Sequence, residues 1–423
     1  MSIHARASNR AAAAAAAVLI LAATADAANT FRVPEDHETI TEALLASEWG
    51  DTILVGPGVY KESLVLSDTK GDGIILKSVE GAETTTIAYG EAGGNVNEAV
   101  ITFQRCGNST QLLGFTIDGR GLARRGILVN SDSQPVLSGL EIGGAEYGIA
   151  SHRGSYPYIE NTNVTSSQTA ALFVQGGSAD VRNCSFSGGE KFGVYVRGSI
   201  DPMRLRDLVV ENNGQVGLQA TESEFTLADS RFSNNGDSGM ILQDVSPEIT
   251  NVVVENHPNV GIVMEACWGT VKDCTINNSE YGLVVSIEGG PEISGCTFQD
   301  NVSYHIGVEG DASPVIGGSL ETANRFLGQP AYLVQSSSSE RVVATHNFWD
   351  QACCPKDLFQ NTGSGRLIRK PWAAGNLMRS FDDCEAAKKY YNKWVNGKLD
   401  ENGNPVGRDD DFLGAVSPAG AGG

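Results

Sequence analysis

The sequence predicts an all-β solenoid, because one short unit repeats along most of the chain. The first observation is a column of apolar residues that recurs at steps of 22 to 25 residues. The column consists of Leu112, Leu137, Ile159, Val181, Leu205, Leu227, Ile249, Val271, Ile293 and Val315. A supersecondary unit repeated at such a period is typical of solenoids, in which each unit packs on its neighbours.

The second observation is a column of turn residues two positions after each of these apolar residues. All of them are Gly, Asn or Asp, which adopt left-handed backbone conformations most readily. They are Gly114, Gly139, Asn161, Asn183, Asp207, Asp229, Asn251, Asp273, Gly295 and Gly317. Apolar residues return three positions later, at Ile117, Ile142, Val164, Phe186, Val210, Phe232, Val254, Ile276, Phe298 and Leu320.

The third observation is a glycine followed by an apolar residue near the end of each unit. These pairs begin at Gly126, Gly148, Gly193, Gly217, Gly239, Gly261 and Gly282, with Ala171-Leu172 in the gap after Gly148. A second turn column lies before them, at Gly119, Gly144, Ser166, Gly188, Asn212, Asn234, Asn256, Asn278 and Asp300. Segments this short fit strands and leave no room for a helix. Coils stacked about 4.8 Å apart would pair each strand in parallel with its copies, which is a parallel β-helix.

Residues 1–27 are predicted to be a secretory signal peptide. Two arginines precede an apolar run over residues 11–23 and a small-residue cleavage site at Ala25-Asp26-Ala27. The run is too short to span a bilayer, and no other segment approaches that length. We therefore expect a chain without a membrane span that is secreted, periplasmic or at the cell surface.

The composition argues against some partners. The formal net charge of −21 makes binding to nucleic acid or to an anionic membrane surface through bulk charge unfavourable. An anionic polysaccharide would need a local basic patch or bridging cations. The predicted organisation is a cap and first coil over residues 28–66, a β-helix over 67–373 and a C-terminal extension over 374–423.

A solenoid needs a cap, because its open end would expose core and unpaired strand edges. Ile40, Ala43 and Leu44 predict the apolar face of a short capping helix, with Trp49 as a further candidate. A strand over 51–55 and a sharp turn at Gly56-Pro57-Gly58 follow. Residues 383–395 predict a helix near the other end. Its aromatic residues available for packing are Tyr390, Tyr391 and Trp394.

The eight cysteines are compatible with disulfides in an exported protein. Cys274 and Cys296, in consecutive coils, fit either a disulfide or, like Cys184, a buried thiol. Cys384 is a candidate to pair with Cys353 or Cys354, whereas Cys106 and Cys267 have no evident partner. No cysteine or histidine spacing fits a metal site. Residues 400–405 resemble a calcium loop only weakly, so no cofactor is predicted, and calcium is the alternative left open.

Two end segments resemble those of a known superfamily. "TITEAL" with "GDTILVGPGVYKESLVL" near the start, and "VVATHNFWD" with "GRLIRKPW" near the end, are similar to right-handed parallel β-helix proteins of the pectin lyase-like superfamily. The resemblance covers residues 31–373 and implies the fold and its right hand. It implies no single activity, because the superfamily holds lyases, hydrolases, epimerases, esterases and non-catalytic surface proteins.

No enzyme signature of that superfamily is present. Ser151-His152-Arg153-Gly154 does not match the Gly-His-Gly of polygalacturonases, and Asp201-Pro202 lacks the histidine of epimerases. Whether the protein is an enzyme is therefore undecided. If it is one, a polysaccharide lyase or a glycoside hydrolase is expected. Arg153 or Arg197 would neutralise a uronate carboxyl, and His152 would act as the base.

Outward positions of the coils suggest a basic and aromatic site for a uronate-containing polysaccharide. Aromatic rings stack on sugar faces, and arginines pair with carboxylates. The candidate residues are His152, Arg153, Tyr156, Tyr158, Lys191, Tyr195 and Arg197. The alternative is that these long side chains merely cover a sheet. Asp118, Arg120, Arg124 and Arg125 lie in a coil with three extra residues, expected to be a solvent loop or a loop overhanging the site.

A second hypothesis is a non-catalytic surface or scaffolding solenoid. It rests on the missing enzyme motifs and on an outward column that is more apolar than a solvated face needs. The stripe proposed to meet a protein partner is Phe173, Tyr195, Ile241, Val263 and Val284.

Overall fold

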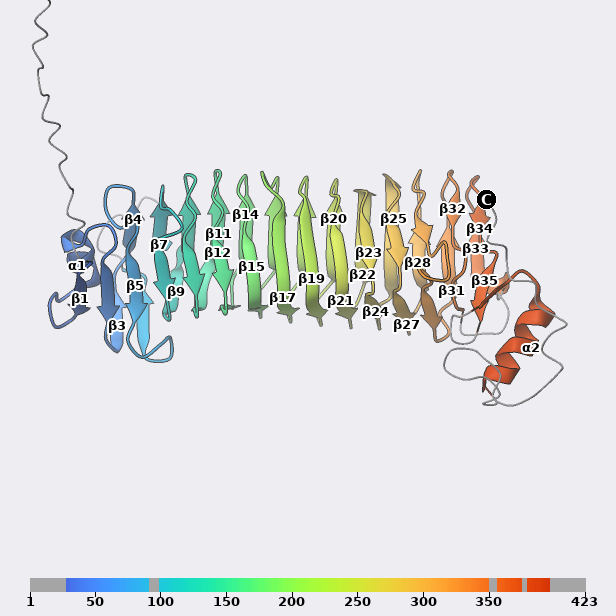
Figure 1. Ribbon diagram of the computed structural model, residues 1–423, viewed down its shortest axis with the longest axis horizontal. Helices are drawn as coiled ribbons and strands as arrows, with labels where there is room; N and C mark the ends of the chain where they lie inside the picture. Colours follow the sequence, from blue (N-terminus) through green and yellow to red (C-terminus); the bar gives the residue numbers. More distant parts are fainter. Residues whose placement is uncertain (1–27, 91–98, 350–355, 375–378, 396–423) are drawn as a thin grey trace, which may run out of the picture.

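Three parallel ladders of strands run along one axis and form the faces of a solenoid of about 15 turns (Figure 1). The computed structural model describes residues 28–90, 99–349, 356–374 and 379–395. The predicted signal peptide, the candidate calcium loop, Cys353 and Cys354 lie outside these residues.

The first sheet carries the first apolar column. Its strands are β1 (Thr30–Val33), β2 (Thr52–Val55), β5 (Ile75–Ser78), β8 (Gln111–Leu113), β10 (Val136–Ser138), β12 (Tyr158–Glu160), β23 (Thr270–Lys272), β26 (Glu292–Ser294), β29 (Val315–Ile316), β32 (Val342–Val343) and β34 (Leu367–Ile368). The second sheet follows the first corner. Its strands are β3 (Gly58–Lys61), β6 (Thr85–Ala88), β13 (Asn163–Thr165), β24 (Thr275–Asn277), β27 (Thr297–Gln299) and β30 (Arg325–Leu327).

The third sheet closes each coil. Its strands are β4 (Leu64–Ser67), β7 (Ala99–Gln104), β14 (Ala170–Gln175), β16 (Phe192–Arg197), β18 (Val216–Thr221), β20 (Ser238–Gln243), β22 (Val260–Cys267), β25 (Tyr281–Gly289), β28 (Tyr304–Val308), β31 (Tyr332–Ser336) and β33 (Phe359–Asn361). Longer strands bend at a corner and join two sheets. They are β9 (Thr116–Asn130), β11 (Glu141–His152), β15 (Asp180–Ser187), β17 (Met203–Glu211), β19 (Phe225–Ser233) and β21 (Glu248–Glu255).

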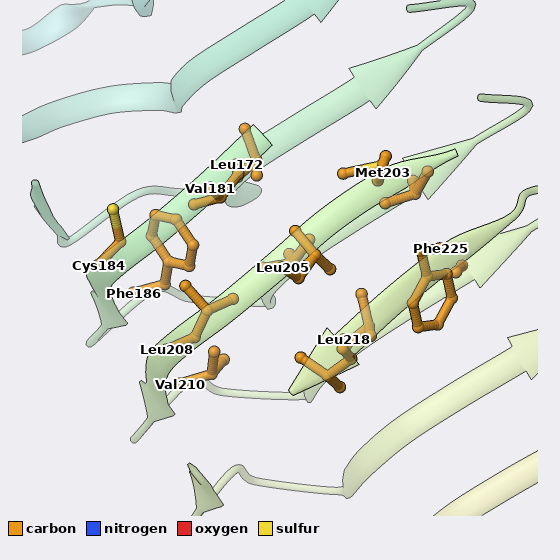
Figure 2. Close-up of a cluster of buried hydrophobic side chains, with 14 of the residues drawn as sticks. Leu172, Val181, Cys184, Phe186, Met203, Leu205, Leu208, Val210, Leu218 and Phe225 are labelled. Carbon is orange, nitrogen blue, oxygen red and sulfur yellow. The ribbon is translucent and has the colours of Figure 1, made fainter. Parts of the chain in front are cut away.

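The core is the inside of the solenoid, where equivalent residues of successive coils stack. Val181 pairs with Leu205, and Phe186 pairs with Val210, in the parallel register. Figure 2 shows these side chains gathered in one buried cluster. Val181 and Val271 are fully buried, as the column predicts.

The turn columns have the predicted backbone conformation. Every residue of the first turn column has a positive φ, from 49° at Asn161 to 84° at Gly317. In the second column the prediction is wrong only at Gly119. There the positive φ falls on Arg120 and Gly121, because three extra residues displace the corner.

The predicted register is wrong in the last unit of the first apolar column. Ile293 pairs with Ile316, and Val315 faces outward with 36% of its surface exposed. Phe326, rather than Leu320, stacks on Phe298. The coil lengthens here, since Cys296 N donates to Asn324 Oδ1 across 28 residues instead of 22.

Helix α1 (Ile40–Ala46) caps the N-terminal end of the stack (Figure 1). It begins at Thr39, whose Oγ1 accepts a hydrogen bond from Glu42 N at 3.1 Å. Ile40, Ala43 and Leu44 are buried as predicted. Trp49 is 71% exposed, so its predicted packing on the helix face is wrong. The helix ends before it, and its indole lies against Gly73 on the outside of the coil.

The C-terminal end carries the hairpin of β35 (Trp372–Ala374) and β36 (Arg379–Phe381) and the predicted helix, α2 (Cys384–Val395). A short 3₁₀ helix, η1 (Lys356–Leu358), precedes β33. Tyr390 of α2 is buried against Phe381, with 5.4 Å between ring centroids. The side chains of Tyr391 and Trp394 lie outside the description. Neither described helix is long and apolar enough to cross a membrane.

Five cysteines are free and buried inside the coils, namely Cys106, Cys184, Cys267, Cys274 and Cys296. Cys274 and Cys296 are neighbouring thiols, so the disulfide considered for them is not formed and the buried-thiol interpretation holds. Cys384 is disulfide-bonded, as predicted for it.

A steric contact explains the glycines that precede an apolar residue near the end of each coil, which we call the glycine column. A Cβ atom on Gly239 would lie 2.5 Å from the carbonyl oxygen of Gly261 in the next coil. Gly217 and Gly261 meet the following coil in the same way, at 2.6 and 2.5 Å. Side chains at these positions would force neighbouring coils beyond strand-pairing distance.

We expect Gly239→Val to lower the free energy of unfolding by about 3 kcal/mol, because the side chain overpacks the contact between two coils. Urea denaturation followed by circular dichroism measures this. Gly107→Val is the matched control, since a Cβ there meets only Asp72 Oδ1 at 3.6 Å. Equal losses in the two variants would contradict the steric explanation.

Candidate functional site

Four aromatic side chains stack on the outer face of the third sheet, and we call them the aromatic cluster. Its members are Tyr147, Phe173, Phe192 and Tyr195. Ring centroids are 4.8 Å apart for Tyr147 and Phe173, 5.3 Å for Phe173 and Tyr195, and 4.8 Å for Phe192 and Tyr195. These distances are those of offset stacked rings.

Register explains how this cluster forms. Phe173 pairs with Ala150 on one side and with Tyr195 on the other. Ala170 stands between Tyr147 and Phe192 in the neighbouring column. The small alanines therefore leave room in which rings from adjacent coils overlap. Phe173 is buried in the middle, whereas the other three rings remain partly exposed.

His152 lies at the edge of the cluster, at the end of β11. Its ring meets Phe173 edge-on, with 5.3 Å between centroids. Burial, and after it the charges of Arg125, Arg153 and Arg124, lower the pKa of His152 to about 4. The imidazole is therefore neutral at neutral pH and offers one donor and one acceptor nitrogen.

Two buried polar atoms beside the cluster lack partners. Among the described residues, His152 Nε2 and Asn130 Oδ1 form no hydrogen bond. The two residues belong to one outward column, because the preceding residues Val129 and Ser151 are paired. Buried polar atoms are rarely left unpaired, so these atoms indicate a place for water or for a ligand hydroxyl.

Three cations near the cluster are unpaired. Arg153, Lys191 and Arg197 form no ion pair with any described residue, and all three are exposed. Arg197 lies two strands from His152, with Gln175 between them. Arg153 follows His152 at the corner, with a φ of 48°. Lys191 directly precedes β16, at its opposite end.

Tyr156 and Tyr158 lie elsewhere, so the prediction that they join the other candidates is wrong. β12 follows the corner and belongs to the first sheet, which faces another direction. Tyr158 OH donates to Glu160 Oε2 at 3.1 Å, and the Arg182 guanidinium lies 5.6 Å from its ring centroid. Tyr156 is close to the charges of Arg204, Asp180 and Asp201 on this same side.

The first sheet has its own cavity, of about 300 Å³. It is lined by Tyr158, Asp180, Arg182, Arg204, Leu205, Arg206, Thr226 and Ala228. Its arginines are paired, Arg182 with Glu160 at 2.8 Å, Arg204 with Asp180 at 3.7 Å and Arg206 with Asp207 at 3.2 Å. Positive charge here is already matched, whereas Arg153, Lys191 and Arg197 have no acidic partner among the described residues.

The coil with three extra residues forms no separate loop. Its residues continue the strand β9 from Thr116 to Asn130. Arg124 lies 3.6 Å from Glu146, and Arg120 donates to the carbonyl of Tyr89 at 3.1 Å. Neither the solvent loop nor the overhanging loop expected here forms, because strand replaces them, and Arg124 and Arg125 lie near His152.

Tyr147 and Phe192 were not among the predicted site residues. Both directly precede a residue of the glycine column, Gly148 and Gly193. An aromatic residue before that glycine is the signal that would have found them. The apolar stripe predicted for a protein partner does lie on this face, since its members stand in the column of Phe173 and Tyr195.

No metal centre is evident in the described part of the chain. Groups of three or more His, Cys, Asp or Glu arranged to hold a metal ion are absent there.

An acidic cavity of about 340 Å³ lies at the corner between the third and first sheets. It is lined by Ser199, Ile200, Asp201, Pro202, Glu222, Ser223, Glu224, Asp244 and Ser246.

Comparison with known proteins identifies the fold. Residues 125–267, which include the aromatic cluster, match the family model "Right handed beta helix region". The chain is a right-handed parallel β-helix. This confirms the resemblance at the level of the fold, and no specific enzyme family is matched. No curated protein matches the sequence.

Several solved structures are similar to this β-helix at low identity. The A-module of mannuronan C-5 epimerase AlgE4 from Azotobacter vinelandii is 12% identical, with a TM-score of 0.43 over 78% of this chain and 91% of that chain. The periplasmic alginate epimerase AlgG is 10% identical, with a TM-score of 0.43 over 80% and 83%. The Dettilon tailspike protein is 13% identical, with a TM-score of 0.45 over 78% and 64%.

We expect His152 to titrate near pH 4. The midpoint is measured by NMR from the ring resonances of His152, which are assigned by comparison with the His152→Gln variant. Below about pH 6.5 the unfolded chain binds this proton and the folded chain does not, so His152 should reduce stability as the pH falls from about 6.5 to 4. Replacing nearby positive charge, as in Arg153→Gln, should raise the midpoint. A midpoint near 6.5 in the native protein would contradict the buried, cationic surroundings.

Proposed function

We propose that the protein is exported and binds an acidic, uronate-containing polysaccharide on the outer face of the third sheet. One observation carries the proposal: a stacked aromatic cluster is flanked by unpaired cations in a protein of net charge −21. Rings supply apolar platforms for sugar faces, and cations supply partners for carboxylates. The rings and Arg197 lie on strands, and Arg153 and Lys191 directly adjoin strands, so the spacing of the coils fixes where they stand.

The aromatic rings and the arginines have different roles in the proposed binding. Tyr195, Phe192 and Tyr147 are the partly exposed rings, and they offer edges and outer faces to the sugar. Arg153 directly follows the end of β11 and Arg197 ends β16, on coils about 10 Å apart by the strand spacing. They would therefore meet carboxylates of different residues along a chain that follows the solenoid axis.

His152 is assigned a binding role. Its neutral ring would exchange a hydrogen bond with a sugar hydroxyl through Nε2, which has no partner among the described residues. Asn130 Oδ1 would accept from the same ligand or from a bridging water. We assign His152 no part in a chemical step, because a histidine with a pKa of about 4 is a weak base at neutral pH.

The alternative, a scaffolding solenoid with a protein partner, rests on the apolar part of this same face. Ile241 and Val263 are partly exposed there. Unpaired cations and unpaired buried polar atoms favour the sugar, because a protein surface would have to match each of them to avoid a desolvation penalty.

We expect Arg153→Ala and Arg197→Ala each to weaken binding of polygalacturonate about tenfold, and Tyr195→Ala to do so similarly, since each removes an interaction of about 1.4 kcal/mol. Isothermal titration calorimetry measures the dissociation constants. Higher salt should weaken the wild type and have less effect on the arginine variants.

Arg206→Ala and Tyr158→Ala are the matched controls, because they remove the same residue types from the first sheet, where Arg206 is paired with Asp207. Both should bind like the wild type. Absence of binding to any uronate polymer, or equal losses in the control variants, would overturn the proposed function.

A further inference from the structure

A second set of aromatic residues lies on the same face, nearer the C-terminal end of the solenoid. Tyr281, Tyr304 and Tyr332 begin the consecutive third-sheet strands β25, β28 and β31 and pair with one another in register. We call them the tyrosine ladder. The ring centroids of Tyr281 and Tyr304 are 4.6 Å apart. All three rings are partly exposed.

The ladder repeats the construction of the aromatic cluster. The ring of Tyr304 covers Gly307, whose added Cβ would lie 2.6 Å from Tyr304 Cε2. Tyr147 likewise stands three residues before a small one, Ala150, on its own strand. In both places a small residue leaves space on the sheet surface that the aromatic ring can occupy. The ring is thereby supported from beneath, as a binding platform requires.

The two sets belong to one continuous surface. Phe192 and Tyr281 are four strands apart in the same outward column, which corresponds to about 19 Å along the axis. Gln219, Ile241 and Val263 lie in the neighbouring column between them. No described strand or helix covers these residues. A single extended chain lying along the axis would therefore contact both sets.

The two sets differ in charge. Positive charges of Arg124, Arg125 and Arg153 act on His152 beside the cluster. At the ladder, burial and then the negative charge of Glu309 and the neighbouring Tyr281 raise the pKa of Tyr304 to about 12. Each set has an acid nearby, Glu146 at Tyr147 and Glu309 at Tyr304, but only the cluster also has exposed cations without an acidic partner among the described residues. A carboxylate is therefore favoured beside the cluster and repelled beside the ladder. An uncharged sugar suits the ladder.

We infer that the ligand is an acidic heteropolysaccharide in which uncharged sugars separate the uronates, and that the tyrosine ladder binds its uncharged part. This inference rests on the proposed function, since the cluster anchors the uronates. A ligand chain that reaches both sites binds more tightly than one that reaches a single site, because the second contact forms within the same complex.

The test compares two linear polymers on the full-length protein. Gellan carries one glucuronate among uncharged sugars in each repeat, and polygalacturonate is charged at every residue. Tyr304→Ala should weaken gellan binding about tenfold and leave polygalacturonate within about twofold. Tyr304→Phe keeps the ring and should bind like the wild type. Gly307→Val keeps Tyr304 but displaces its ring, and it should behave like Tyr304→Ala.

Tyr158→Ala on the first sheet is the matched control, and circular dichroism of each variant verifies folding. If polygalacturonate binds through Arg153 and Arg197 while Tyr304→Ala leaves gellan binding unchanged, the ladder inference is overturned and the proposed function stands. Equal losses for the two polymers in Tyr304→Ala would also overturn the ladder's preference for uncharged sugar. If neither polymer binds, both proposals fail.

Discussion

Parallel hydrogen bonding between successive coils is the constraint on which the structure depends. It holds each strand about 4.8 Å from its copies, and the glycine column permits that approach where two backbones meet. Because the spacing is constant, any residue type repeated at the period of the coil becomes a row of contacting side chains. Core, corners and outer faces are all consequences of this one spacing.

Inside the solenoid, the spacing lets polar residues satisfy one another. Asn213 Nδ2 donates to Asn235 Oδ1 in the next coil at 3.0 Å. His305 accepts from Asn301 at Nδ1 and donates from Nε2 to the carbonyl of Leu327, which fixes a neutral tautomer. Burial lowers its pKa to about 4. Such rows cost little because these buried side chains find hydrogen-bond partners in the same or the neighbouring coil.

On the outer faces the same spacing produces different results. The first sheet pairs its arginines with acids, for example Arg182 with Glu160. The third sheet instead stacks rings such as Phe173 and Tyr195, and beside them it leaves Arg153 and Arg197 without acidic partners in the described structure. The proposed binding surface therefore differs from the first sheet because its arginines have no acidic partner within the described structure.

The sequence alone determined the repeat, the inward stacks, the capping helix and nearly every left-handed corner, because each follows from periodicity or from a local backbone preference. Only the tertiary structure decided the register after the lengthened coil, where Ile316 replaces Val315. It also decided that Tyr158 lies on the first sheet and Tyr195 on the third, because the angle of the corner between two strands determines which way each sheet faces. The contacts of His152 with Phe173 and nearby arginines likewise depend on residues in other coils, and no local pattern encodes which outward side chains meet across coils.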